Sequence, residues 1–153
     1  MATGMRVSAA VRTAAAVPEA VRWAAGRLAL LVGREVFVVG RRLALPTAQR
    51  ASRLLGSRAI RAASFADFRQ RLPDTARWAL DGVDDAADLW QAEARWWDRL
   101  EWDGAELLRG SRMGSAPVMG AVAVLSVDAW RVHGALELAA QGGRPTEVFA
   151  APG

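Results

Sequence analysis

The sequence contains no cysteine, lysine, tyrosine or asparagine, and it has one isoleucine and one histidine. Without cysteine the chain can form no disulfide, no thiolate metal site and no cysteine nucleophile. Most of the scarce residue types are encoded by AT-rich codons, so a GC-rich genome explains why they are rare. All 20 basic residues are therefore arginine, and the net charge of +4 is by itself poor evidence for nucleic-acid binding.

Long uncharged apolar runs are also missing. The most apolar stretch is LALLVGREVFVVGRRLAL, which is interrupted by Arg34, Glu35, Arg41 and Arg42. A membrane span needs about 20 nearly uncharged residues, so this stretch predicts a buried amphipathic helix instead. The first 20 residues contain no strongly apolar core, and we do not expect a signal peptide.

Acidic residues are scarce in the first part of the chain. Residues 1–66 hold eleven arginines and two acids, a net charge of +9, whereas residues 67–153 hold nine arginines and fourteen acids, a net charge of −5. This asymmetry predicts either different partners for the two parts or two parts that face each other.

Apolar residues recur at helical spacing along nearly the whole chain, and no alternating strand pattern is longer than a few residues. We therefore predict an all-α fold, a helical bundle with a C-terminal antiparallel helical hairpin. Residues 1–17 are expected to be a flexible segment, followed by a single helical domain over 18–149. Within that domain, 18–66 is basic and 84–142 forms the acidic hairpin.

Proline, glycine and capping residues set the expected helix limits. Ser64 and Asp67 mark a helix start, Asp81-Gly82 marks a turn, and Asp84 or Asp85 can cap the first hairpin helix. The expected helices run from Pro18 to about Leu43, from Pro46 through Arg61, from Ser64 to Pro73, from about Ala86 to Arg109, and from Pro117 to Gln141. A Gly142-Gly143 cap and one last turn in PTEVF would follow.

Three tryptophans crowd the segment EARWWDRLEWDG, residues 93–104. Four residues form one stripe along the expected helix, separated by seven, four and seven positions: Leu89, Trp96, Leu100 and Leu107. Trp90 and Trp97 lie beside this stripe. We interpret these six residues as a packed core face. Trp102 lies about 200° from Leu100 around the helix, so either a neighbouring helix covers it or it is an exposed anchor for a partner.

Residues with catalytic potential form no recognisable constellation. His133 and Asp128 are five residues apart and point in different directions around a helix, and no serine lies in a nucleophile elbow. Helix capping explains the aspartate cluster at 81–88 without a metal, because the cluster lacks the spacing of an EF-hand loop. No phosphate-binding or dinucleotide-binding motif is present. We therefore expect no enzyme, no cofactor and no metal site.

Arginines could instead form a binding surface. Arg27, Arg34 and Arg41 are spaced seven apart on the first expected helix, and four more follow on the second, namely Arg50, Arg53, Arg58 and Arg61. Such ridges could bind phosphates of nucleic acid or an anionic lipid surface. Solvated arginines are equally common on ordinary helices, so this arginine-rich helical module is the alternative function.

The C-terminal third carries a family resemblance, in WWDRLEWDGAELLRGSRMGSAPVMGAVAVLSVDAWRVHGALELAAQGGRPTEVF. A charged helix ends in Asp103 and Leu107-Leu108, and a loop with Gly114 and Pro117 follows. A long helix then carries Asp128 shortly before Arg131, and a glycine-rich turn closes the pattern. This order of features resembles the C-terminal part of the C/d-subunit family of the V/A-type ATPases.

The resemblance implies a mechanical role. Members of this family link the central axle of a rotary ATPase to its proteolipid ring during proton or ion transport, and they catalyse nothing themselves. It implies axle and proteolipid-ring subunits as partners, and a cytoplasmic location at the inner face of the membrane, reached through those partners. The contact candidates are Trp102, Asp128, Arg131 and His133.

Overall fold

The computed structural model describes residues 18–110 and 114–141, and every regular element in these ranges is a helix. The predicted all-α class is confirmed. The chain divides into two compact units, residues 1–99 and 100–153, so the boundary falls inside one long helix. The predicted flexible segment 1–17, the Gly142-Gly143 cap and the last turn lie outside the described residues. The single domain over 18–149 stays a prediction.

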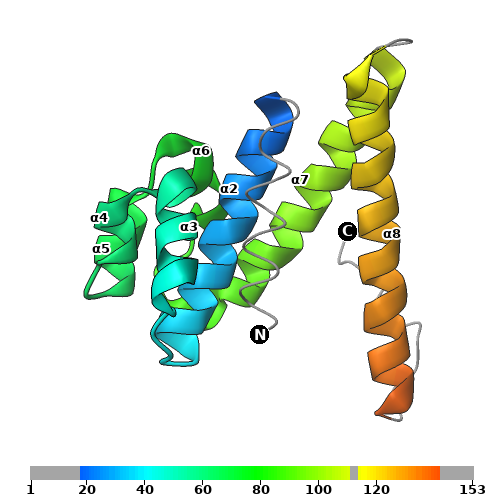
Figure 1. The fold of residues 1–153 in the computed structure, drawn as a ribbon. Coiled ribbons are helices and arrows are strands. Elements are labelled where there is room, and N and C mark those ends of the chain that lie inside the picture. The colour runs from blue at the N-terminus through cyan, green and yellow to red at the C-terminus, as the bar shows by residue number, and fades with distance from the viewer. Residues whose placement is uncertain (1–17, 111–113, 142–153) are drawn as a thin grey trace. The chain divides into compact units, whose positions relative to one another are not determined.

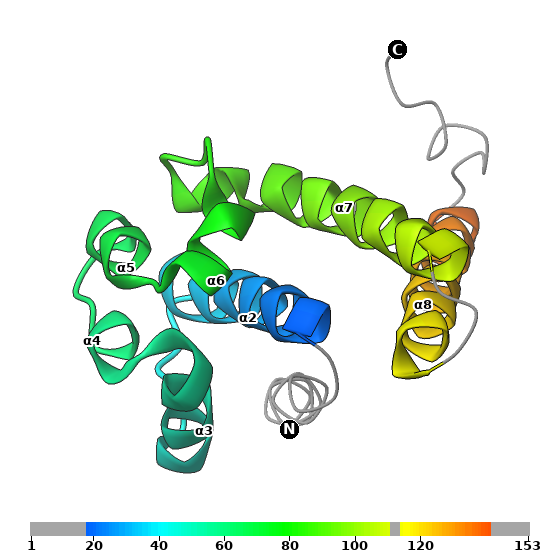
Figure 2. The ribbon, with the colours of Figure 1, turned by 90° about the horizontal axis from the view of Figure 1, so that it is seen from above.

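Unit 1 is built around its first described helix, against which α3 and α6 pack (Figures 1 and 2). Its elements are α2 (Pro18–Gly33), the π-helix η1 (Arg34–Val38), α3 (Leu45–Leu55), α4 (Ser57–Ile60), α5 (Phe65–Arg71), α6 (Asp74–Arg77), the 3₁₀ turns η2 (Trp78–Leu80) and η3 (Ala86–Asp88), and the start of α7 (Leu89–Gly110).

The core of unit 1 combines large side chains from several helices with alanines on α2. Its largest fully buried side chains include Leu28, Leu55, Phe68, Leu72 and Leu80. Burial of each such side chain stabilises the fold by about 1.5–3 kcal/mol. Small residues of α2, among them Ala25 and Ala29, are fully buried and allow neighbouring helices to approach closely.

Local capping signals place the helix starts where the sequence predicts them. The Ser64 hydroxyl accepts a hydrogen bond from the Asp67 backbone N–H at 3.2 Å, and the Asp85 carboxylate accepts one from the Ala87 N–H at 2.9 Å. Helix α5 ends before Pro73, and Gly82 takes a positive φ of 71° in the Asp81-Gly82 turn. The structure confirms these predicted boundaries. They are predictable because each depends on residues close to it in the sequence.

Two predicted helices are shorter than expected. The first was predicted to reach Leu43, but helical structure ends at Val38, and Gly40 has a φ of +75°. The second was predicted to continue through Arg61, but Gly56 has a φ of +81° and separates α3 from α4. Both predictions were wrong because glycine readily adopts a left-handed backbone that a helix cannot contain.

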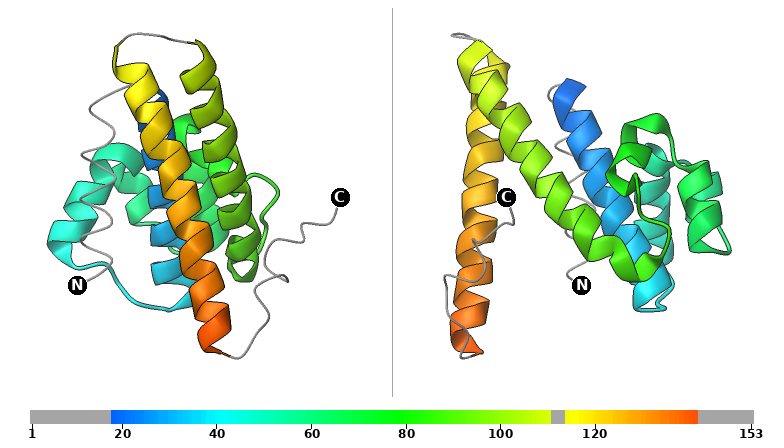
Figure 3. Two further views of the ribbon diagram at one scale, coloured as in Figure 1. Left: turned by 90° about the vertical axis from the view of Figure 1, so that its right-hand side faces the viewer. Right: turned by 180° about the vertical axis from the view of Figure 1, so that it is seen from behind.

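Unit 2 contains the end of α7 and helix α8 (Ser115–Ala140), which run in opposite directions as a hairpin (Figure 3). The helices approach closely where both carry glycine. A Cβ added to Gly120 would lie 2.7 Å from the Gly104 carbonyl oxygen, and one added to Gly104 would lie 2.9 Å from the Cβ of Ala123. The predicted hairpin helices, 86–109 and 117–141, agree closely with α7 and α8.

The predicted core face of α7 is correct in part. Leu89, Trp96 and Leu100 are buried, and Leu107 and Trp97 are half-buried. Trp90 is 67% exposed, so its assignment to the core face was wrong. Helical periodicity places Trp90 and Trp97 on the same side, but burial also requires a neighbour at that turn of the helix.

Candidate functional site

Arg131, one of the predicted contact residues, joins the two helices of the hairpin. Its guanidinium donates two hydrogen bonds to Glu101, at 2.8 Å to Oε1 and 2.6 Å to Oε2. Two parallel bonds of this kind fix the orientation of both side chains. In unit 2, Arg131 therefore contacts α7, and its predicted contact with a partner stays a prediction.

Asp128 and His133 are both exposed on α8. His133 Nε2 lies 2.9 Å from Oε1 of Glu137, one helical turn further along. Counted at about 100° per residue, Asp128 and His133 lie about 140° apart around the helix axis. The structure therefore places them on opposite flanks of one helix face.

Trp102 is 64% exposed on α7. The sequence leaves two alternatives open for Trp102: a neighbouring helix covers its ring, or the ring is exposed. The structure shows the ring exposed. An exposed indole offers a large rigid apolar surface, and tryptophan is enriched among residues that dominate binding energy at protein interfaces. Trp102 therefore remains a contact candidate.

A row of exposed apolar side chains along α8 is the largest feature that the sequence analysis missed. The exposed fractions of its five large members are 62%, 48%, 66%, 58% and 64%, in the order Val118, Val122, Leu125, Val132 and Leu136. Ala129 continues the row and is also exposed. We call these six residues the α8 stripe.

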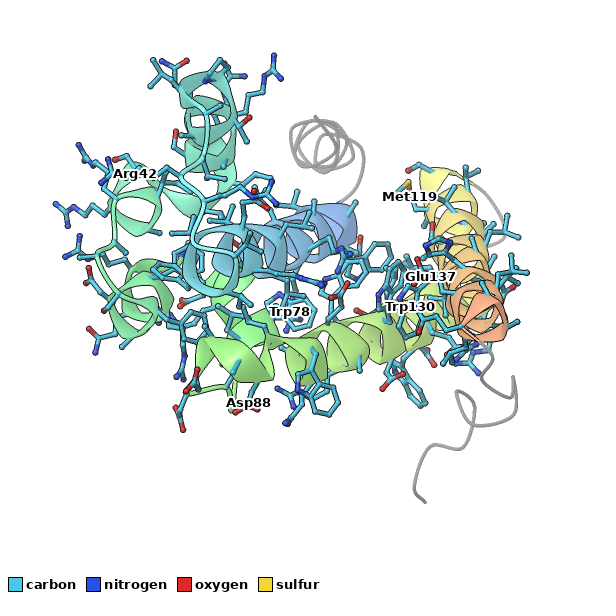
Figure 4. The ribbon with its side chains drawn as sticks, turned by 90° about the horizontal axis from the view of Figure 1, so that it is seen from below. Arg42, Trp78, Asp88, Met119, Trp130 and Glu137 are labelled. Atoms are coloured by element: carbon cyan, nitrogen blue, oxygen red, sulfur yellow. The ribbon has the colours of Figure 1, made fainter. Side chains whose placement is uncertain are left out.

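The α8 stripe lies opposite the face of α8 that packs on α7. At about 100° per residue its six members fall within an arc of roughly 80°. Gly120, Ala123 and Val127 are buried, and they lie on the other side of the helix. Figure 4 views α8 nearly along its axis and shows side chains on the side away from α7. One face of α8 is thus covered within unit 2, whereas the opposite face is apolar and exposed.

The sequence does carry a signal for this surface. The stripe residues are separated by four, three, four, three and four positions, which is the spacing of a coiled-coil seam. In the sequence, the buried residues of α8 alternate with the residues of the α8 stripe. The helix is therefore apolar around most of its circumference, and its hydrophobic pattern does not identify one buried face. A search for two opposite stripes would have found the α8 stripe.

A second exposed surface lies in unit 1. All six arginines from 41 to 61 are exposed, namely Arg41, Arg42, Arg50, Arg53, Arg58 and Arg61; we call them the arginine segment. Figure 4 shows Arg42 on the surface of unit 1. The predicted ridge of Arg27, Arg34 and Arg41 does not form, because Arg27 is partly buried and Arg41 lies beyond the end of the helix.

Arg27 belongs to a structural cluster with tryptophans. Its guanidinium lies 5.5 Å from the ring centroid of Trp96 and 5.4 Å from that of Trp97, and it pairs with Glu93 at 2.5 Å. The Trp96 indole N–H donates to the Trp23 carbonyl at 3.1 Å. A hollow beside this cluster measures about 190 Å³, smaller than the roughly 300–1,000 Å³ of typical ligand pockets. These contacts show that Arg27 and the tryptophans around it stabilise the packing of unit 1.

Three of the four aspartates at 81–88 have partners for their side chains within unit 1. Asp84 pairs with Arg69 at 2.7 Å, Asp85 caps its helix, and Asp88 accepts a hydrogen bond from Gln91 at 3.3 Å. Over residues 18–110 and 114–141, no group of three or more side chains is placed to hold a metal ion.

None of the described helices is both long and apolar enough to cross a lipid bilayer. Comparison with known proteins gives no match for this chain among protein-family models, curated proteins or solved structures.

Proposed function

We propose that the protein is a non-catalytic assembly subunit that acts by docking its C-terminal hairpin onto other helices. The observation that carries this proposal is the α8 stripe, an apolar face left exposed on a helix whose opposite face is packed on α7. Exposed contiguous apolar surface is costly in water, at about 25 cal/mol per Å², and commonly marks an interaction site.

The hairpin is suited to docking because it is already ordered. The Arg131–Glu101 pair and the close approach at Gly104 and Gly120 hold α8 against α7. A helix that is fixed before binding loses little further conformational entropy when a partner covers it.

The specific form that we propose is the one implied by the family resemblance, a coupling subunit between the axle and the proteolipid ring of a rotary ATPase. Such a protein would be cytoplasmic and would reach the inner face of the membrane through its partners. The exposed Trp102 indole would then be one contact of the hairpin with those partners.

The test is a pull-down of tagged protein from gently solubilised host membranes, with co-purifying chains identified by mass spectrometry. We expect axle and proteolipid subunits to be recovered, and Trp102→Ala to reduce their recovery. Trp90→Ala is the matched control, because Trp90 is on the same helix and is 67% exposed against 64% for Trp102. Recovery of neither kind of subunit from a host that expresses the complex would contradict the rotary-ATPase form.

A second candidate function rests on the arginine segment, whose six exposed cations lie within 21 residues that contain no acid. This density of positive charge would favour a polyanion. Binding to duplex DNA should weaken with salt, with a logarithmic slope of about −0.9 per phosphate neutralised.

Anisotropy titrations with labelled DNA at several salt concentrations would measure that slope. The double variant Arg53→Ser/Arg58→Ser should lose about two phosphate contacts and so make the logarithmic salt slope shallower by about 1.8. Arg99→Ser, at an exposed position outside the segment, should leave the slope unchanged. Equal salt slopes for the unmodified chain, the double variant and the Arg99→Ser variant would exclude the arginine segment as a DNA-binding site.

A further inference from the structure

The α8 stripe has the register of a two-stranded helical seam. In heptad terms Val122, Ala129 and Leu136 occupy a positions, and Val118, Leu125 and Val132 occupy d positions. Asp128 then falls at a g position and His133 at the following e position. These are the two positions from which charged groups pair across a coiled-coil interface.

Unit 2 has the wrong charge for an anionic lipid surface. Its described residues contain five acids and two arginines, a net charge of −3; the acids are Glu101, Asp103, Glu106, Asp128 and Glu137, and the arginines are Arg109 and Arg131. Helices that lie on anionic membranes carry lysine or arginine beside their apolar face. On α8 the flanks of the stripe carry Asp128 and His133 instead.

We propose that the α8 stripe is covered by the α8 stripe of a second copy of this chain, with the two helices parallel and in register. Asp128 of each protomer then lies opposite His133 of the partner subunit, and two-fold symmetry makes this contact twice. The inference rests on the proposed docking role of the hairpin and names its partner.

His133 has the capacity for this contact. Its Nε2 is occupied by Glu137 at 2.9 Å, and Nδ1 has no hydrogen-bond partner among the described residues. A protonated imidazole donates from both nitrogens, so Nδ1–H can bind a carboxylate from across the interface. Asp128, on the other flank of the stripe, supplies such a carboxylate in the parallel arrangement.

Charge favours the parallel arrangement over the antiparallel one. If the stripes were antiparallel and fully overlapped, their common midpoint would lie near position 127, halfway between Val118 and Leu136. In an antiparallel pair g positions face g positions, so the two Asp128 carboxylates would meet beside that midpoint. Like charges facing each other are destabilising, and the parallel pairing of Asp128 with His133 avoids this.

The seam is short but preformed. Helix α8 has 26 residues, about 39 Å at 1.5 Å per residue. Isolated helices in a short coiled coil must order as they associate, whereas α8 is already packed on α7 through its buried Gly120, Ala123 and Val127. The small Ala129 near the middle of the stripe lets the two backbones approach closely.

Sedimentation equilibrium of the full chain tests whether a dimer forms. We expect a dimer that Leu125→Glu weakens by roughly 100-fold or more, because a carboxylate is placed within an apolar seam. Leu45→Glu is the matched control, since Leu45 is 71% exposed against 66% for Leu125 and belongs to unit 1. A monomer at all concentrations, or equal weakening by both variants, would overturn the proposal.

Cysteine cross-linking tests the orientation, and the natural absence of cysteine makes single-site variants unambiguous. In a parallel dimer Val118→Cys and Val132→Cys should each form a disulfide with the same position of the second copy. In the antiparallel arrangement Val118 would lie about 27 Å from its own counterpart and next to Leu136. Cross-linking only in a mixture of Val118→Cys and Leu136→Cys would overturn the parallel pairing.

These results are separable from those of the membrane pull-down. If the chain is a monomer but still recovers axle and proteolipid subunits, the proposed dimer is wrong and the proposed function is supported. A parallel dimer that recovers neither would support the second copy and contradict the rotary-ATPase form.

Discussion

Arg131 in α8 donates to both carboxylate oxygens of Glu101 in α7, at 2.8 Å and 2.6 Å, and the two residues are 30 positions apart in the sequence. The two side chains are 36% and 39% exposed, so water screens much of their attraction. The pair therefore contributes more to the geometry of the hairpin than to its stability.

A double-mutant cycle should measure this contribution. We expect a coupling free energy of about 0.5–1 kcal/mol between Arg131→Met and Glu101→Gln, read from urea unfolding of the two single variants and the double variant. A coupling indistinguishable from zero would show that the ion pair is not maintained in solution.

Gly120 should not tolerate a larger residue. A Cβ there would lie 2.7 Å from a backbone oxygen of α7, which cannot move aside as a flexible side chain would. We expect Gly120→Ala to lower the free energy of unfolding by about 1–3 kcal/mol, measured by chemical denaturation.

Gly134 provides the control for Gly120 on the same helix. Nothing lies within 4 Å of a Cβ placed there, so Gly134→Ala should raise stability by up to about 1 kcal/mol through better helix propensity. Destabilisation by both substitutions would mean that the close approach at Gly120 is not the cause.

Trp96 and Trp90 should differ sharply on truncation. Trp96 is buried and its indole N–H is bonded to the Trp23 carbonyl, so Trp96→Ala should cost about 3–5 kcal/mol of stability. Trp90 is exposed, and Trp90→Ala should change stability by less than about 0.5 kcal/mol. Thermal unfolding followed by circular dichroism compares them, and similar losses would contradict the assigned burial.

The cap at Ser64 should stabilise α5. Ser64→Ala removes the acceptor for the Asp67 N–H and should cost about 1 kcal/mol. Ser115→Ala is the control, because Ser115 is exposed and the cap position of α8 is Gly114. The comparison is made by urea denaturation, and an equal loss from both substitutions would argue against the cap.

The sequence predicts structure well where the cause is local. Ser64, Asp85, Pro73 and Gly82 act on residues within a few positions of themselves, and the structure agrees at all four. Gly40 and Gly56 are equally local signals, and greater weight on them would have corrected the two helices that were predicted too long.

The sequence predicts less where burial depends on distant residues. Trp90 and Trp97 share a helical face but differ in exposure, and the seam spacing of α8 does not reveal which of two apolar faces α7 covers. Likewise the sequence does not reveal that Arg131 bonds Glu101, because only the folded hairpin brings these two residues close; its contact with a partner stays a prediction.

The approach of α7 to α8 at Gly104 and Gly120 also has a consequence for how the gene can change. Every missense change in either codon adds a Cβ to a contact with no room for one. We therefore expect random mutagenesis to yield few functional variants at these two codons and many at the codon for Gly134, although all three specify the same amino acid.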